Sequence, residues 1–193
     1  MKHIFMGLFL LALCAFPGCG YNSLQGLDED VKAAWAEVEN QYQRRHDLIP
    51  NLVQTVKGYA KHERETLEAV IDARSKATQI NLGAEALSDP KAFARFEEAQ
   101  NQLTQALSKL MLLVERYPDL KANTNFRDLQ AQLEGTENRI AVARRRYIHA
   151  VAEYNKGVRY FPTNLTAKFL LHLEPRETFK IPDEMKQLPK VEF

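Results

Sequence analysis

Residues 27–77 read LDEDVKAAWAEVENQYQRRHDLIPNLVQTVKGYAKHERETLEAVIDARSKA. Their apolar side chains recur at alternating steps of three and four, which places them on one stripe of a helix. A stripe of this kind predicts partner helices that cover it. Its members are Val31, Trp35, Val38, Tyr42, Ile49, Val53, Val56, Ala60, Leu67, Val70 and Ala77.

Pro50 lies inside this stripe and leaves two alternatives. It either kinks one long helix or sits in the first turn of a second helix that has Asp47 as its N-cap. We favour a break near residues 46–49, because the chain could then turn back and pack as antiparallel neighbours.

The same periodicity continues as far as Phe161. Asp89 and Pro90 are typical of a helix start, with Asp89 as N-cap and Pro90 at the first helical position. Strand-like alternation is absent from the sequence. We therefore expect an all-α protein, an up-and-down antiparallel four-helix bundle with long helices and a Pro-containing C-terminal tail.

The first residues are typical of an export signal. Ile4 to Phe16 is an apolar run of 13 residues, whereas a membrane-spanning helix needs about 20. Gly18 precedes Cys19 as in a bacterial lipobox, where cleavage leaves a diacylated cysteine as the new first residue. We expect lipidation at Cys19. The alternative is an uncleaved anchor in which Cys19 is an ordinary thiol.

This interpretation divides the chain into four parts. They are a signal peptide of the lipoprotein type at 1–18, a tether at 19–26, a helical bundle at 27–161 and a C-terminal tail at 162–193. The tail can form one short helix, at 164–173, and it contains Pro175, Pro182 and Pro189. Its apolar residues predict that it packs on the bundle instead of hanging free.

Charge and motif spacing exclude several classes of function. The chain has 26 Lys and Arg against 25 Asp and Glu, so it has no overall field that would attract nucleic acid. Patterns typical of a metal site, a phosphate-binding loop or a nucleophilic serine are absent. We expect no catalytic residues, no metal and no cofactor. An unrecognised hydrolase that uses Glu63 or Glu115 is the alternative.

A polar group surrounds Pro50. Arg45 is in phase with the apolar stripe, so we expect it to be partly buried and paired with a carboxylate. The candidate partners are Glu39, Asp47 and Glu115, and a structural ion pair is the simpler interpretation of this arginine. The candidates for an exposed partner-binding surface are Gln43, Arg44, Asp47, Asn51 and Lys57.

Long blocks of the chain resemble the LemA family. The blocks include YNSL at 21–24, VENQYQRR at 38–45, DLIPNLV at 47–53, VKGY at 56–59, ERYP at 115–118, Tyr154-Asn155, and PKVEF at 189–193. The resemblance implies a membrane-associated helical bundle of bacterial cell envelopes with no established enzymatic activity. It also implies association with other envelope components, among them membrane proteases.

Together these features predict a non-enzymatic envelope lipoprotein. It would be a helical scaffold that is held at the membrane by Cys19 and binds other envelope proteins, with no nucleic-acid partner. The alternative is a sensor or lipid-handling module whose basic run, Arg144 to Arg146, contacts phospholipid head groups. Gly20 stands where Asp would resemble an inner-membrane retention signal. We therefore expect the periplasmic face of the outer membrane rather than the inner membrane.

Overall fold

The computed structural model describes residues 20–60, 62–80 and 82–179, and within these ranges the chain is all-helical with no strand. The predicted signal peptide, Cys19 and the part of the tail from residue 180 onward lie outside the described residues. None of the described helices combines the length and the apolar composition that crossing a bilayer requires.

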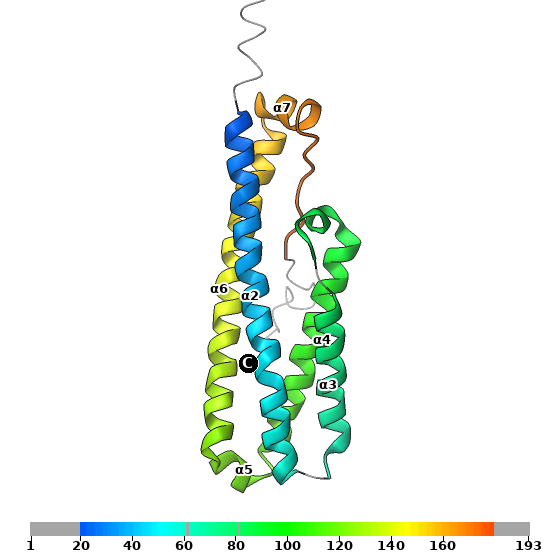
Figure 1. Ribbon diagram of the computed structural model, residues 1–193, viewed down its shortest axis with the longest axis vertical. Helices are drawn as coiled ribbons and strands as arrows, with labels where there is room; N and C mark the ends of the chain where they lie inside the picture. The colour runs from blue at the N-terminus through cyan, green and yellow to red at the C-terminus, as the bar shows by residue number, and fades with distance from the viewer. Residues whose placement is uncertain (1–19, 61, 81, 180–193) are drawn as a thin grey trace, which may run out of the picture.

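Successive long helices run up and down along the long axis of the molecule (Figure 1). Helix α2 packs along α6, and α3 packs along α4. The short helix α5 lies at the lower end in this view, and α7 lies at the upper end beside the start of α2. The elements are α2 (Tyr21–Tyr59), α3 (Arg64–Gln79), the 3-10 helix η1 (Ala84–Ser88), α4 (Pro90–Val114), α5 (Pro118–Ala122), α6 (Thr124–Arg159) and α7 (Thr163–Phe169).

The core has an aliphatic lower half and an aromatic upper half. All members of the predicted apolar stripe are buried, which confirms that assignment. In the upper half Trp35 lies 5.1 Å from Tyr147 and 5.4 Å from Phe96, measured between ring centroids. Its indole nitrogen donates a hydrogen bond to the carbonyl of Leu82 at 3.0 Å. This aromatic cluster joins α2, α4 and α6.

Helix α2 begins earlier than expected. It starts at Tyr21, so most of the predicted tether at 19–26 is helical and that boundary is wrong. The physical reason is Leu24, which is seven residues before Val31 on the same stripe and is fully buried. The stripe therefore extends to the first turn of the helix. The residue before that turn, Gly20, has a left-handed backbone conformation with φ 105°.

Helix α2 also passes through Pro50 without a break, so the predicted break near residues 46–49 and the N-cap role of Asp47 are wrong. A proline has no N–H to donate to the carbonyl four residues earlier, which here belongs to His46. Nε of Arg74, on α3, donates to that carbonyl instead, at 2.8 Å. The hydrogen bond that the proline removes from α2 thus becomes a contact between α2 and α3.

The start of the C-terminal tail is attached to the upper half of the helices. After α7, residues 170–179 run back beside α6, whose side chains contact the tail backbone. Tyr154 Oη donates to the carbonyl of Glu174 at 3.1 Å, and the side chain of Asn155 makes two hydrogen bonds with the backbone of Arg176. Phe179 ends this segment inside the aromatic cluster, 6.2 Å from Trp35.

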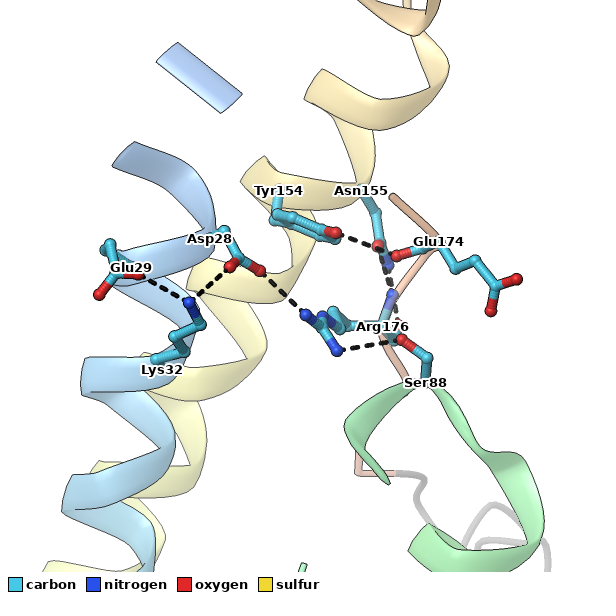
Figure 2. Close-up of polar contacts among 8 residues, drawn as sticks. All are labelled: Asp28, Glu29, Lys32, Ser88, Tyr154, Asn155, Glu174 and Arg176. Carbon is cyan, nitrogen blue, oxygen red and sulfur yellow. Dashed lines mark hydrogen bonds and ion pairs between the residues drawn. The ribbon is translucent and has the colours of Figure 1, made fainter. Parts of the chain in front are cut away.

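The side chain of Arg176 connects the tail to two other elements (Figure 2). Its guanidinium donates to a carboxylate oxygen of Asp28, on α2, at 3.0 Å and to Oγ of Ser88, at the end of η1, at 3.2 Å. Asp28 is buried, which opposes its ionisation, but hydrogen bonds from Lys32 and Arg176 outweigh this effect and lower its pKa. The sequence interpretation missed this pair. The sequence feature that could have revealed it is the position of Asp28 on the buried stripe, four residues after Leu24.

A double-mutant cycle tests the contact between Arg74 and the carbonyl of His46. Arg74→Met should lower the free energy of unfolding by about 1–2 kcal/mol, because a partly buried carbonyl loses its donor. In a Pro50→Ala background the same change should cost less, because alanine supplies a backbone N–H to that carbonyl. Urea denaturation measures both differences, and Arg64→Met, at an exposed position of α3, is the control. Equal losses in the two backgrounds would contradict this role.

Candidate functional site

The predicted partner-binding residues all lie exposed on α2. They are Gln43, Arg44, Asp47, Asn51 and Lys57, and we call them the α2 polar face. At 100° per residue they occupy less than half of the helix circumference, and they extend over about 20 Å of its length. Nε2 of Gln43 donates to Asp47 at 2.7 Å. The structure therefore places these residues along one continuous helix.

Arg45 lies directly behind this face and is 2% exposed. Its Nη1 donates to a carboxylate oxygen of Glu137, on α6, at 3.0 Å and to Oγ1 of Thr104, on α4, at 3.2 Å. Its Nη2 donates to the side chain of Gln100, also on α4. The guanidinium carbon lies 4.9 Å from the centroid of the Tyr42 ring. A single arginine from α2 thus holds three helices together.

The expected carboxylate partners of Arg45 were wrong. Glu39 and Asp47 belong to the same helix as Arg45, and Glu115 lies at the far end of α4 and pairs with Lys121 at 2.6 Å. The true partner, Glu137, is 92 residues away in the sequence. Its pairing depends on how α6 is aligned with α2, which periodicity within each helix does not specify.

His46 is the buried titratable neighbour of this network, and it is 4% exposed. It lines a pocket of about 290 Å³ between α2, α3 and α4, together with Glu39 and Gln100. Burial, reinforced by the Arg45 cation, lowers the pKa of His46 from 6.5 to about 4. The imidazole is therefore neutral near pH 7. Among the described residues, no three His, Cys, Asp or Glu side chains are grouped so that they could hold a metal ion.

The carboxylates proposed for a hydrolase are part of contacts at the lower end. Glu63, in the loop after α2, accepts hydrogen bonds from Tyr117 Oη at 2.9 Å and from Arg116 at 3.1 Å. These bonds join that loop to the turn after α4. Glu115 pairs with Lys121 of α5. The geometry gives both carboxylates a structural role.

The basic run on α6 does not act as one surface. The guanidinium of Arg144 lies 4.1 Å from the centroid of the Phe179 ring and 3.9 Å from a carboxylate oxygen of Glu97. It therefore covers the end of the tail segment. Arg145 and Arg146 are exposed.

Comparison with known proteins identifies one family. The model of the LemA family matches residues 34–193. Magnetosome protein MamQ 2 of Paramagnetospirillum magneticum is 25% identical over 197 residues, which cover 92% of this chain and 72% of that protein. Magnetosome protein MamQ of Magnetospirillum gryphiswaldense is 25% identical over 86% of this chain and 68% of its own length. Protein LemA of Metamycoplasma hominis is 24% identical over 77% of this chain and 64% of its own length.

The lowered pKa of His46 predicts a loss of stability in mild acid. As the pH falls through 6.5, the unfolded chain binds a proton at this position, whereas the folded chain does not until about pH 4. Between pH 7 and pH 5 this difference should lower the free energy of unfolding by about 2 kcal/mol. His46→Gln should remove that part of the pH dependence, and His62→Gln, at an exposed position, should not. Urea unfolding of the wild type and both variants at pH 7 and pH 5 measures these differences. An unchanged pH dependence in His46→Gln would contradict the assignment.

Proposed function

Since the chain belongs to the LemA family, we propose that it is a non-enzymatic scaffold of the cell envelope. It is held at a membrane through Cys19 and binds another envelope protein along the α2 polar face. Its four long helices serve as an up-and-down bundle that keeps this face extended. We assign it to the periplasmic face of the outer membrane, because Gly20 follows the cysteine.

The proposal rests on the directions in which the polar side chains from Gln43 to Lys57 point. Arg45 points inward and is used by the fold, and the carbonyl of His46 is bound by Arg74. The five residues of the α2 polar face point outward. Within the described residues, their side chains make no hydrogen bond or ion pair with another helix.

Two further observations support a binding role over an enzymatic one. Glu63 and Glu115, the carboxylates that a hydrolase would need, hold the lower turns together. The names of the relatives, MamQ and LemA, state no reaction. The alternative of a lipid-handling module that uses Arg144 to Arg146 is less favoured, because Arg144 packs on Phe179.

Metabolic labelling with an alkyne analogue of palmitate tests the anchor. The label should enter the wild-type protein and Cys14→Ser, because Cys14 would leave with the signal peptide. It should not enter Cys19→Ser, which has no thiol at the cleavage site. Mass spectrometry should find a mature N-terminus at an acylated Cys19. Label in Cys19→Ser, or a mature chain that starts at Met1, would refute lipidation at this position.

Photo-cross-linking in intact cells tests the binding face. A photoreactive amino acid at position 51 should capture a partner, and one at position 109, exposed on α4, should not. Arg44→Glu should lower the yield at position 51 by at least about fivefold, because it reverses a charge in the proposed contact. Arg145→Glu makes the same charge change on α6 and should leave the yield unaltered. Recovery of monomer alone, or equal yields in both variants, would exclude the α2 polar face.

A further inference from the structure

The upper end of the molecule exposes a group of large apolar side chains. Phe161 follows the last turn of α6, and Phe169 ends α7; they are 75% and 70% exposed. Leu165 and Phe169 are four residues apart on α7 and therefore share a helix face. We call the following residues the α7 end: Tyr21, Tyr160, Phe161, Leu165, Phe169 and Leu170, all of which are exposed. Exposed apolar groups gathered at one place mark an interaction surface.

Most of the charge at this end is positive. Lys156 pairs with Glu153 at 2.7 Å. Beyond that pair, residues 157–173 contain Arg159 and Lys168 but no Asp or Glu, and residues 20–27 carry no charge. This is unusual for a chain in which Lys and Arg balance Asp and Glu. Nζ of Lys168 lies 5.7 Å from the centroid of the Phe169 ring, so a cation and an aromatic side chain are presented together. Aromatic and basic side chains beside aliphatic ones are the composition that proteins use at a membrane interface.

The opposite end of the molecule, around α5 and the loop after α2, differs in its exposed side chains and its charges. The described residues near this end include two exposed large apolar side chains, Tyr59 and Leu112 in the last turn of α4. The hydroxyl of Tyr59 accepts a hydrogen bond from Asn123 at 2.9 Å. The charges there are of both signs and form pairs, such as Glu63 with Arg116. Within the described residues, a group of several exposed apolar side chains with cations beside them is therefore found at the α7 end.

The chain outside the structure leaves from this same end. Gly20, the residue after Cys19, packs against Thr163 at the start of α7, so closely that a Cβ at position 20 would lie 2.6 Å from Thr163 Cγ2. Figure 1 shows the start of α2 and α7 together at the upper end. The preceding residues include the apolar run from Ile4 to Phe16 and Cys19. Any membrane attachment through those residues would hold the α7 end next to the bilayer.

We propose that the α7 end is a membrane-contact surface. Phe161, Leu165 and Phe169 enter the interface of a phospholipid bilayer, and Arg159 and Lys168 lie among anionic head groups. This inference rests on the membrane attachment proposed above and adds an orientation to it. Helices α2 and α6 stand along the membrane normal. The α2 polar face then lies about 35 to 55 Å from the bilayer, at 1.5 Å of helix rise per residue.

Fluorescence quenching tests this orientation with the full-length protein as processed in cells. The protein is reconstituted into phosphatidylcholine–phosphatidylglycerol vesicles whose acyl chains are brominated near the head group. The native Trp35 is buried in the core, so the brominated lipid does not reach it and its fluorescence is a constant background. In Phe169→Trp, brominated lipid should lower the added tryptophan fluorescence by at least about twofold. The matched control is Leu112→Trp, because Leu112 is 73% exposed on α4, away from the α7 end.

Vesicle flotation, measured on the same samples, separates the two levels of the proposal. Flotation together with selective quenching in Phe169→Trp supports the membrane-contact surface. Flotation without that quenching overturns the surface and leaves the anchor standing; a second copy of the chain would then cover the patch. Equal quenching in both variants overturns the upright orientation. Absence of flotation overturns both the anchor and the surface.

Discussion

The arrangement of the helices depends on the need to neutralise one buried cation. Arg45 is almost completely enclosed, and an unpaired guanidinium in such a place would cost several kcal/mol. Glu137, Gln100 and Thr104 can all reach it only when α4 and α6 take one alignment beside α2. The apolar contacts above and below have less directional preference than hydrogen bonds. The hydrogen bonds of Arg45 require each partner at a specific position and so specify the alignment.

Periodicity along the chain predicted what is buried, but not what pairs with what. The apolar stripe from Val31 to Ala77 and the Asp89 cap follow from local spacing, and the structure has both. The continuity of α2 through Pro50 could not be predicted, because it depends on Arg74 from another helix. The pairs Arg45–Glu137 and Arg176–Asp28 could not be predicted either, because the two members of each pair are distant in sequence.

Several residues that carry the family resemblance turn out to connect elements of the fold. Tyr117 binds Glu63 across the lower turns, and Tyr154 and Asn155 hold the backbone of the tail. Arg45 and Pro50 lie in the same blocks and have the roles described above. Residues of this kind say little about a ligand. The candidate site is therefore found among the outward-facing residues of those blocks, where a contact with another helix does not explain the choice of side chain.

The placement of Phe179 has a consequence for how the protein is made. Its ring completes the cluster formed by Trp35, Phe93 and Tyr147, so an early helix and a late segment share one core. During synthesis from the amino terminus, Phe179 is added 144 residues after Trp35. The emerging polypeptide would lack its finished aromatic centre until then. Tight packing around Trp35 is therefore postponed until all the helices between these two residues have been made.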